Sequence, residues 1–341
     1  MIRRQLARLL GAAILIVVAL ALLFTAWPQI FGQSRTLVIA QVVSLRGLAA
    51  AVGLVLVLAL TLDVLLAAPI RKFAASLAVM LLVFSLINVA VLSTRGFGST
   101  GFQSANDNDV TVLSWNTLGD APGADAIADL ALAQGADIIT LPETTERTGV
   151  LVAQRMERSG FPMTVITNAF DQVSKARSTT LLVSVALGDY QEVTDRGSTS
   201  QLPSVIAEPT DGTGPTILAV HPVAPIPGEL DRWRSDLDWL STVCTGDNVI
   251  MAGDFNSTLD HYTHLDHADG ATIGDCTDAA SLSGNAAVGT WPTTLPPLLG
   301  TPIDHVMLTD NWRVSGMRVI ESRDGAGSDH RPLVVQLTPA G

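Results

Sequence analysis

Three long apolar runs occupy the first hundred residues and limit what this chain can fold into. The first (Leu9 to Phe31) has no charged residue, the second (between Arg46 and Arg71) has only Asp63, and the third (Phe73 to Thr94) has none. Each reaches the roughly 20 residues that a helix needs to cross the hydrocarbon core of a bilayer. We therefore predict a transmembrane region over residues 1–95, with spans at about 9–31, 47–68 and 73–94.

Two features of this region have alternative interpretations. A cleaved signal peptide is the alternative for the first run, because Arg3, Arg4 and Arg8 precede it. Its apolar stretch exceeds the usual 7 to 15 or so residues of such a peptide, which favours a span. The start of the second span stays open, because Leu37 to Leu45 is also apolar and fits either its first turns or an interfacial segment.

The charge of the chain changes sign near residue 96. Residues 1–96 carry eight basic residues and one acidic residue, a net charge of +7, and the rest carries 12 and 31, a net charge of −19. The N-terminus and the connector Pro69 to Lys72 are basic, so the positive-inside rule places both in the cytoplasm. Arg35, Arg46 and Arg95 oppose this assignment. We expect a multi-pass protein of the cell membrane whose C-terminal domain is extracytoplasmic.

The remainder of the chain alternates short strand-like runs with helical ones. Residues 96–108 are rich in Gly, Ser and Asn and predict a flexible linker before a domain over 109–341. We expect strands at 109–115, 137–141, 179–185, 204–208, 216–221, 248–254, 303–308 and 332–337, and helices at 123–134, 146–159 and 229–243. Strands that are apolar throughout indicate an α/β domain with a packed pair of sheets flanked by helices.

Both cysteines, Cys244 and Cys276, fall in this domain. A disulfide between them would contribute roughly 3 to 4 kcal/mol in the chain-entropy model. Two buried free thiols are the alternative, and the sequence favours neither.

Polar residues gather at the ends of the expected strands. Taken singly, a carboxylate there is more often an N-cap or a turn residue, and a lone histidine is more often structural. Their ordered occurrence along the chain is what indicates a functional site. The set consists of Asn116, Glu143, His221, Asp254, Asn256, Asp304, Asp329 and His330.

This ordered set resembles the endonuclease/exonuclease/phosphatase superfamily, which includes DNase I-like nucleases, inositol polyphosphate 5-phosphatases and neutral sphingomyelinases. The resemblance covers about residues 109 to 338 and is most specific at GDFN (253–256) and SDHRP (328–332), with support from GTWPT (289–293) and PIDHVML (302–308). It implies a four-layer α/β/β/α sandwich with a divalent-metal phosphoesterase site at one edge of the paired sheets.

The resemblance also implies roles on the metal side. Asn116, Glu143 and Asp329 would be the metal ligands, with Glu143 the principal one. Oxygen ligands of this kind suit Mg²⁺, with Mn²⁺ as the alternative ion.

The remaining members of the set would be catalytic. Asp254 would orient or deprotonate the attacking water, and Asn256 would hold a phosphoryl oxygen or the nucleophile. His221 and His330 would contact the non-bridging oxygens and stabilise the transition state. Asp304 would fix the tautomer of His330, the general acid/base candidate.

Two further features permit more than one interpretation. Arg177 precedes a strand and is either a phosphate ligand or a surface residue. His261, His264 and His267 alternate with Asp260, Asp266 and Asp269, which suggests zinc. Their spacing matches no closed zinc site, so we favour a loop that shapes substrate access.

The substrate class is narrowed by the spans and the charge. A membrane-anchored site and a domain charge of −19 favour a lipid-linked phosphate over nucleic acid. The layout resembles bacterial membrane proteins associated with resistance to teicoplanin-type glycopeptides, which implies a polyprenyl-pyrophosphate phosphatase. The alternatives are an anchored extracellular nuclease, a phospholipase C-like phosphodiesterase and a non-catalytic interaction domain. We expect no obligate protein partner.

Overall fold

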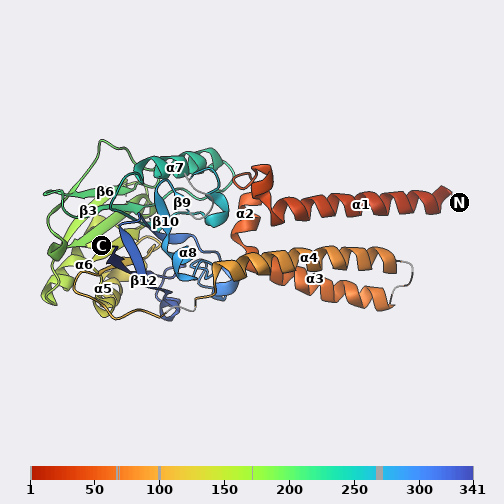
Figure 1. Ribbon diagram of the computed structural model, residues 1–341, viewed down its shortest axis with the longest axis horizontal. Coiled ribbons are helices and arrows are strands. Elements are labelled where there is room, and N and C mark those ends of the chain that lie inside the picture. The colour runs from red at the N-terminus through yellow and green to blue at the C-terminus, as the bar shows by residue number, and fades with distance from the viewer. Residues whose placement is uncertain are drawn as a thin grey trace. The chain divides into compact units, whose positions relative to one another are not determined.

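The computed structural model describes residues 2–66, 68, 70–98, 101–170, 172–265 and 272–340. It divides into an N-terminal unit, Met1–Thr94, and a C-terminal unit, Arg95–Gly341 (Figure 1). The apolar runs lie in the first unit, and every candidate site residue lies in the second.

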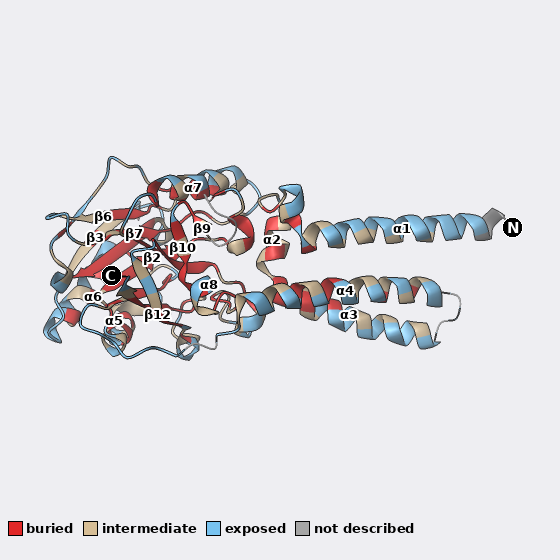
Figure 2. Ribbon diagram, viewed as in Figure 1, coloured by how far each residue is buried: buried red, intermediate tan, exposed pale blue. Residues whose placement is uncertain are grey.

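The N-terminal unit consists of helices. They are α1 (Ile2–Ala26), the 3₁₀ turn η1 (Pro28–Phe31), α2 (Ile39–Ser44), α3 (Arg46–Leu66) and α4 (Arg71–Arg95). Three segments are long and apolar enough to cross a membrane, namely Gln5–Ala26, Arg46–Leu66 and Arg71–Arg95. Large apolar side chains along these helices are exposed (Figure 2), as expected for helices that face lipid.

The structure corrects the predicted end of the first span and settles where the second span begins. The first helix ends at Ala26 and not near residue 31, because Pro28 has no N–H to continue the helical hydrogen bonds. The apolar segment before Arg46 forms the separate short helix α2, and α3 begins after a break at Leu45.

Close packing and one polar contact join these helices. A Cβ atom on Gly53 of α3 would clash with the side chain of Ser85 of α4. Glycine therefore permits the two helices to approach closely. The buried Arg46 donates from Nη1 to Asn88 Oδ1 (2.7 Å) and to the carbonyl oxygen of Ala26 (3.2 Å). One guanidinium therefore links α1, α3 and α4.

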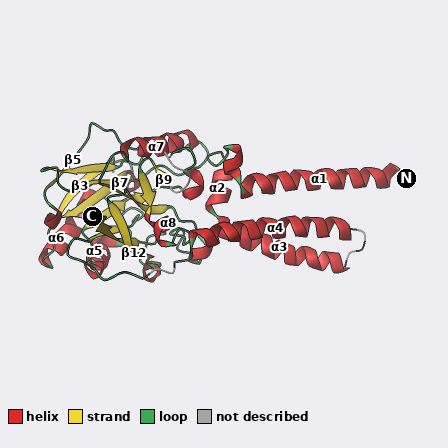
Figure 3. Cartoon of the chain, viewed as in Figure 1, coloured by secondary structure: helices red, strands yellow, loops and turns green. Residues whose placement is uncertain are grey.

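The C-terminal unit is built on two mixed sheets (Figure 3). The first has the strand order β12-β13-β1-β2-β4-β3 and the second the order β5-β6-β7-β8-β11-β10-β9. The strands of the first sheet are β1 (Val110–Ser114), β2 (Ile138–Pro142), β3 (Met163–Ala169), β4 (Ser178–Ser184), β12 (Trp312–Val319) and β13 (Leu333–Pro339). Those of the second are β5 (Tyr190–Glu192), β6 (Val205–Pro209), β7 (Thr216–Val220), β8 (Val249–Asp254), β9 (Thr272–Ile273), β10 (Cys276–Asp278) and β11 (Asp304–Leu308).

The two sheets share an apolar core because side chains alternate along their strands. Val112 of β1, Ile138 of β2, Ile217 of β7 and Ile250 of β8 belong to one buried cluster between the sheets. Leu113, the neighbour of Val112, points the other way and packs in a second cluster with α5 and α6.

Helices cover the outer faces of the sheets (Figure 1). They are α5 (Gly123–Gln134), α6 (Glu146–Arg158), α7 (Leu230–Val243) and the short α8 (Ala279–Ser283), with 3₁₀ turns η2 (Lys175–Arg177), η3 (Val185–Leu187), η4 (Leu259–His261), η5 (Pro297–Leu299) and η6 (Glu321–Arg323). The spacing of Leu230, Trp233, Leu237 and Leu240 at three and four residues predicts one apolar face on α7. This face is confirmed, since Trp233, Leu237 and Leu240 are fully buried and Leu230 is half-buried. The predicted α/β/β/α sandwich is likewise confirmed.

Several elements have no counterpart in the sequence analysis. The longest are β3 and β12, which mix polar and apolar residues and lie at the two edges of the first sheet. Part of the expected linker is also paired with the C-terminal unit. Gln103 donates its N–H to the carbonyl of Ser315, and Gly98 donates to that of Gly284.

The two cysteines form a disulfide that joins the end of α7 to β10. Their Cα atoms are 6.0 Å apart, and 32 residues separate them in the sequence. Both side chains are fully buried. The structure therefore settles the open choice in favour of the disulfide.

Removing this cross-link should lower the free energy of unfolding of the C-terminal unit by about 3–4 kcal/mol, because the open chain gains conformational entropy. Urea titration of the detergent-solubilised chain, followed by tryptophan fluorescence, measures this loss. Cys244→Ser and Cys276→Ser should each cost as much as the double variant, since either one breaks the same bond. Additive losses would contradict the assignment.

Candidate active site

The strand register brings the predicted residues to one edge of the sandwich. Strands β1 and β2 run parallel in one sheet and β7 and β8 run parallel in the other. The carboxyl ends of each pair lie together, and β11 begins beside the end of β8, with Asp304 opposite Asp254. We call this end of the sandwich the catalytic edge. Polar side chains just beyond these strand ends are therefore brought close together.

Asn116 and Glu143 follow β1 and β2. The Asn116 amide donates from Nδ2 to Glu143 Oε1 (3.1 Å) and to Asp254 Oδ2 (3.0 Å), while its Oδ1 accepts from the Leu118 N–H. Glu143 has a positive φ of 57°, which is strained for a residue with a side chain. Such strain is typical of functional positions, and here it places the carboxylate between the two sheets.

The GDFN segment ends β8. A Cβ atom at Gly253 would lie 2.0 Å from the carbonyl oxygen of Val220, so only glycine allows β7 and β8 to pair here. Asp254 Oδ1 then accepts from the N–H of Asn256, and Asn256 Nδ2 donates to the carbonyl of Pro222 (2.9 Å). These bonds fix both side chains at the catalytic edge.

His330 lies among three carboxyl groups. Its Nδ1 is 2.9 Å from Asp304 Oδ2, and its Nε2 is 3.7 Å from Asp254 Oδ2 and 4.0 Å from Asp329 Oδ1. Ser328 Oγ accepts from the N–H of His330 and donates to the carbonyl of Asn116. The SDHRP loop is thereby fastened to the loop after β1.

Asp329 is oriented by a tryptophan from the GTWPT segment. Trp291 Nε1 donates to Asp329 Oδ2 over 2.8 Å. Arg331, almost fully buried, donates to the carbonyls of Thr293 and Leu295 and to Asp324. Arg331 therefore holds the loop that carries Trp291.

His221, after β7, lies beside Glu143 and Asp254. Its Nε2 lies 4.0 Å from Glu143 Oε1 and 3.9 Å from Asp254 Oδ2. Asp254 is thus flanked by two imidazoles, one from each sheet. Eight of the nine predicted site residues form one continuous group, which only the fold brings together.

Burial sets the charge states in this group. Burial lowers the pKa of His221 to about 3, so its imidazole is neutral. Burial also raises the pKa of Glu143 and of Asp254. For His330, burial opposes the charged form, but the charges of Asp304 and Asp254 outweigh it and raise the pKa to about 10. One imidazolium therefore sits within a cluster of carboxyl groups.

The donor set fits a divalent metal ion. Asp254, Asp304 and His330 lie close together, with candidate ligand atoms within 4.8 Å of one another. His330 as an imidazolium has no free lone pair, so the carboxylate oxygens of the site are the available ligands. The Oδ1 atoms of Asp304 and Asp329 are buried and lack a hydrogen-bond partner among the described residues. Such oxygens need a cation or a donor, and carboxylate oxygens are the ligands that hard divalent cations prefer. Asn116 would join as a ligand only after its amide turned Oδ1 toward the carboxylates.

Two predicted features lie apart from the central group. Arg177 donates to Gln201 Oε1 (3.0 Å), at the rim of the site. His261 is buried and its Nδ1 accepts the N–H of Thr258, which is a helix-capping contact. Asp260 pairs with Arg95 (2.9 Å), and His264 is exposed. Asp266, His267 and Asp269 lie outside the described residues.

Sequence reasoning missed several residues that support the site. Trp291 and Ser328 lie inside the motifs, so their position beside Asp329 and His330 was the available signal. Lys175 forms an ion pair with Asp120 (3.2 Å), whose N–H donates to the carbonyl of Glu143. No motif in the sequence indicated that Lys175 would lie near the site. The buried pair of His305 and Asp278 (2.5 Å) also went unnoticed; His305 Nε2 lies 2.9 Å from the Ser257 carbonyl and so fixes the segment after Asn256.

Residues 113–330 match the family model described as Endonuclease/Exonuclease/phosphatase family. The chain belongs to this family. Members of the family are metal-dependent hydrolases that act on phosphate esters, and this protein is an enzyme of that class. No curated protein matches the chain at a significant level.

Solved structures with the same fold are similar to the C-terminal unit. A humanized D. rerio TDP2 carrying 14 mutations is 15% identical, with a TM-score of 0.51, over 68% of this chain and 100% of that one. An endonuclease/exonuclease/phosphatase from Beutenbergia cavernae DSM 12333 is 17% identical, with a TM-score of 0.51, over 69% and 72%. At this identity the likeness establishes the fold alone.

Trp291→Phe should lower kcat/KM on a soluble phosphate ester by about 10-fold or more, because a hydrogen bond to a charged group contributes about 1.5–3 kcal/mol. The concentration of Mg²⁺ for half-maximal rate should rise as well. Trp312→Phe is the matched control, since it removes an equal 2.8 Å bond, to Asn248, at the opposite edge. Equal losses in both variants would mean that the Trp291 bond only stabilises the fold.

Proposed function

We propose that this protein is a membrane-anchored, Mg²⁺-dependent phosphohydrolase of lipid-linked phosphates or pyrophosphates, with polyprenyl pyrophosphate as the leading candidate. The supporting observation is that one chain contains both three candidate membrane spans and the hydrolytic site of this family. A site attached to membrane helices encounters phosphate esters of lipids at high local concentration.

The proposed location is the outer face of the cell membrane. The basic N-terminus and the basic α3–α4 connector favour a cytoplasmic position for both, which sends α4 outward. The disulfide supports the same orientation, because disulfides persist mainly in oxidising compartments.

Charge supports a lipid substrate over a polynucleotide. From residue 97 onward the chain has 12 basic and 31 acidic residues, a net charge of −19. Nucleases draw much of their affinity from neutralised phosphates, whereas this unit would repel a long polyanion. One phosphate or pyrophosphate group needs only the few cations near the site, and Lys175 and Arg177 on η2 are suitable.

In this proposal each group at the catalytic edge has a defined task. Glu143 and Asp329 would hold the metal ion, with Asn116 as a further ligand, and the ion would supply charge neutralisation at the phosphoryl oxygens. Asp254 orients the attacking water. Asn256, neutral His221 and the His330 imidazolium donate hydrogen bonds to the phosphoryl oxygens, and Asp304 maintains the charge of His330.

Glu143→Gln should reduce phosphate release by at least 100-fold, because it removes the principal charged ligand while keeping the size of the side chain. The assay is release of inorganic phosphate from undecaprenyl pyrophosphate by the purified full chain with Mg²⁺. Glu146→Gln, three residues later and exposed at the start of α6, is the matched control and should retain the wild-type rate.

The same assay separates the competing functions. Plasmid DNA and sphingomyelin serve as parallel substrates, and their cleavage is followed directly. Cleavage of DNA at a higher rate than release from the lipid would favour an anchored nuclease. Release from the lipid that persisted in Glu143→Gln would refute the proposed site.

A further inference from the structure

Four loops surround the catalytic residues, and each exposes large apolar side chains. The loops are 117–122 after β1, 170 and 172–177 between β3 and β4, 222–229 after β7 and 293–300 before β11. The register places the first three at the catalytic edge, since β1 runs parallel to β2, Thr179 of β4 pairs with Pro142 at the end of β2, and Val220 pairs with Gly253. The fourth lies there because Thr293 donates its N–H to the carbonyl of Asp329. We call the exposed apolar residues of these loops the apolar rim. They are Leu118, Phe170, Val173, Ile226 and Leu298, and their exposed fractions range from 46% to 68%.

Exposing these side chains costs free energy that the fold could have avoided. Apolar surface left in water is unfavourable. Among the rim residues Leu118 has a positive φ of 49°, a strained conformation for leucine. Exposed apolar side chains that gather around one active site are typical of a contact surface.

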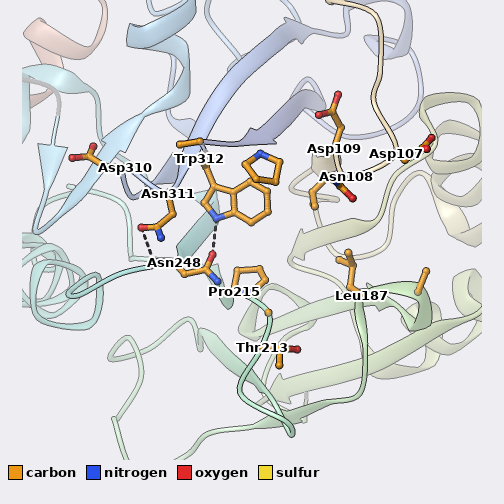
Figure 4. A pocket seen from close by; sticks show the side chains of 15 residues that line it. Asp107, Asn108, Asp109, Leu187, Thr213, Pro215, Asn248, Asp310, Asn311 and Trp312 are labelled. Atoms are coloured by element: carbon orange, nitrogen blue, oxygen red, sulfur yellow. Dashed lines mark hydrogen bonds between the residues drawn. The ribbon is translucent and has the colours of Figure 1, made fainter.

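The opposite edge of the sandwich has a different character. A cavity of about 770 Å³ lies there, near the starts of β1, β7, β8 and β12. Figure 4 shows its lining, in which Asp107, Asp109 and Asp310 surround Trp312, Asn248 and Asn311. This cavity is therefore lined by acidic and polar side chains, whereas the apolar rim lies at the catalytic edge, with Lys175 and Arg177 between its members.

The form of the rim fits a lipid surface and not a peptide. Peptide partners use a continuous groove or a free strand edge, whereas the rim consists of separate side chains on four loops. A bilayer interface needs only that apolar side chains share one edge and that cations lie beside them, as Lys175 and Arg177 do.

The unit that carries the rim is covalently continuous with a candidate membrane span. The C-terminal unit begins at Arg95, which is also the last residue of α4, a candidate span. Its first residues are paired within the unit, because Ala286 and Ala287 donate to the carbonyls of Arg95 and Gly96. The chain therefore passes from the candidate span directly into the unit that carries the rim.

We propose that the apolar rim inserts into the lipid–water interface of the bilayer, so that the site takes its substrate directly from that surface. This inference rests on the lipid-linked substrate proposed above. It adds a specificity determinant, because the rim admits substrates that are anchored in a bilayer and leaves soluble esters without this contact.

Depth-dependent quenching tests the contact without using catalysis. The described residues contain no free cysteine, so one introduced cysteine in the full chain can be labelled selectively with an environment-sensitive fluorophore. Ile226→Cys and Leu298→Cys probe the rim, and Val185→Cys, 45% exposed after β4 at the opposite edge, is the matched control. In nanodiscs with spin-labelled lipids, we expect quenching at the rim at least threefold above the control.

Equal quenching at both edges would overturn the proposal. Quenching of the rim labels by aqueous iodide and not by the lipid label would overturn it too, and would leave the surface to a protein partner. Because neither measurement involves turnover, failure of the proposed phosphatase activity would show separately, as absent phosphate release by a chain whose rim is quenched.

An activity assay then tests whether the contact between rim and bilayer delivers substrate to the site. We expect the double variant Ile226→Ser/Leu298→Ser to lower the ratio of turnover on bilayer-embedded pyrophosphate to turnover on a soluble phosphate ester by at least fivefold. Val185→Ser should keep the wild-type ratio. An unchanged ratio in the double variant would show that the rim does not deliver substrate.

Discussion

The concentration of carboxyl groups at the catalytic edge is the constraint on which the rest of the site depends. Glu143, Asp254, Asp304 and Asp329 lie within one group, and removing such charges from water is costly unless each has a partner. The fold supplies His330 as an imidazolium among Asp254, Asp304 and Asp329. The Asn116 amide donates to Glu143 and Asp254, and the Trp291 indole donates to Asp329. Two carboxylate oxygens are still unpartnered among the described residues, and this deficit is what a divalent cation would offset.

The paired sheets are the device that creates this group. Parallel pairs β1–β2 and β7–β8 place the residues that follow them at the same edge, and Gly253 permits the close approach that brings Asp254 beside His221. Neither sheet holds a complete site, because Asn116 and Glu143 follow strands of one sheet while His221 and Asp254 belong to the other. The apolar core between the sheets therefore also determines the distances between catalytic groups.

The sequence predicted the parts of this arrangement that depend on local pattern. The apolar runs, the α7 face and the strand ends followed from periodicity, and the motifs predicted Asp254 and His330 as members of one site. It did not predict β3 or β12, whose mixed composition reflects their edge positions, nor the partners of the motif residues. The Trp291–Asp329 bond joins residues 38 apart, and the Ser328–Asn116 bond joins residues 212 apart. Such contacts depend on how loops pack, which no residue pattern encodes. The predicted end of α1 was too late, because the prediction followed the hydropathy of residues 27–31 and gave too little weight to Pro28.

The acidic character of the C-terminal unit links the site to its proposed surroundings. A unit with a net charge of −19 slows the diffusional approach of any free polyanion, and a site built from carboxyl groups adds to this barrier near the metal position. The proposed lipid substrate, held in a bilayer, would avoid the barrier, because it would reach the site by lateral movement across the edge that carries the apolar rim, Lys175 and Arg177. A charge distribution that disfavours a long polyanion would therefore cost little to an enzyme whose substrate arrives along a lipid surface.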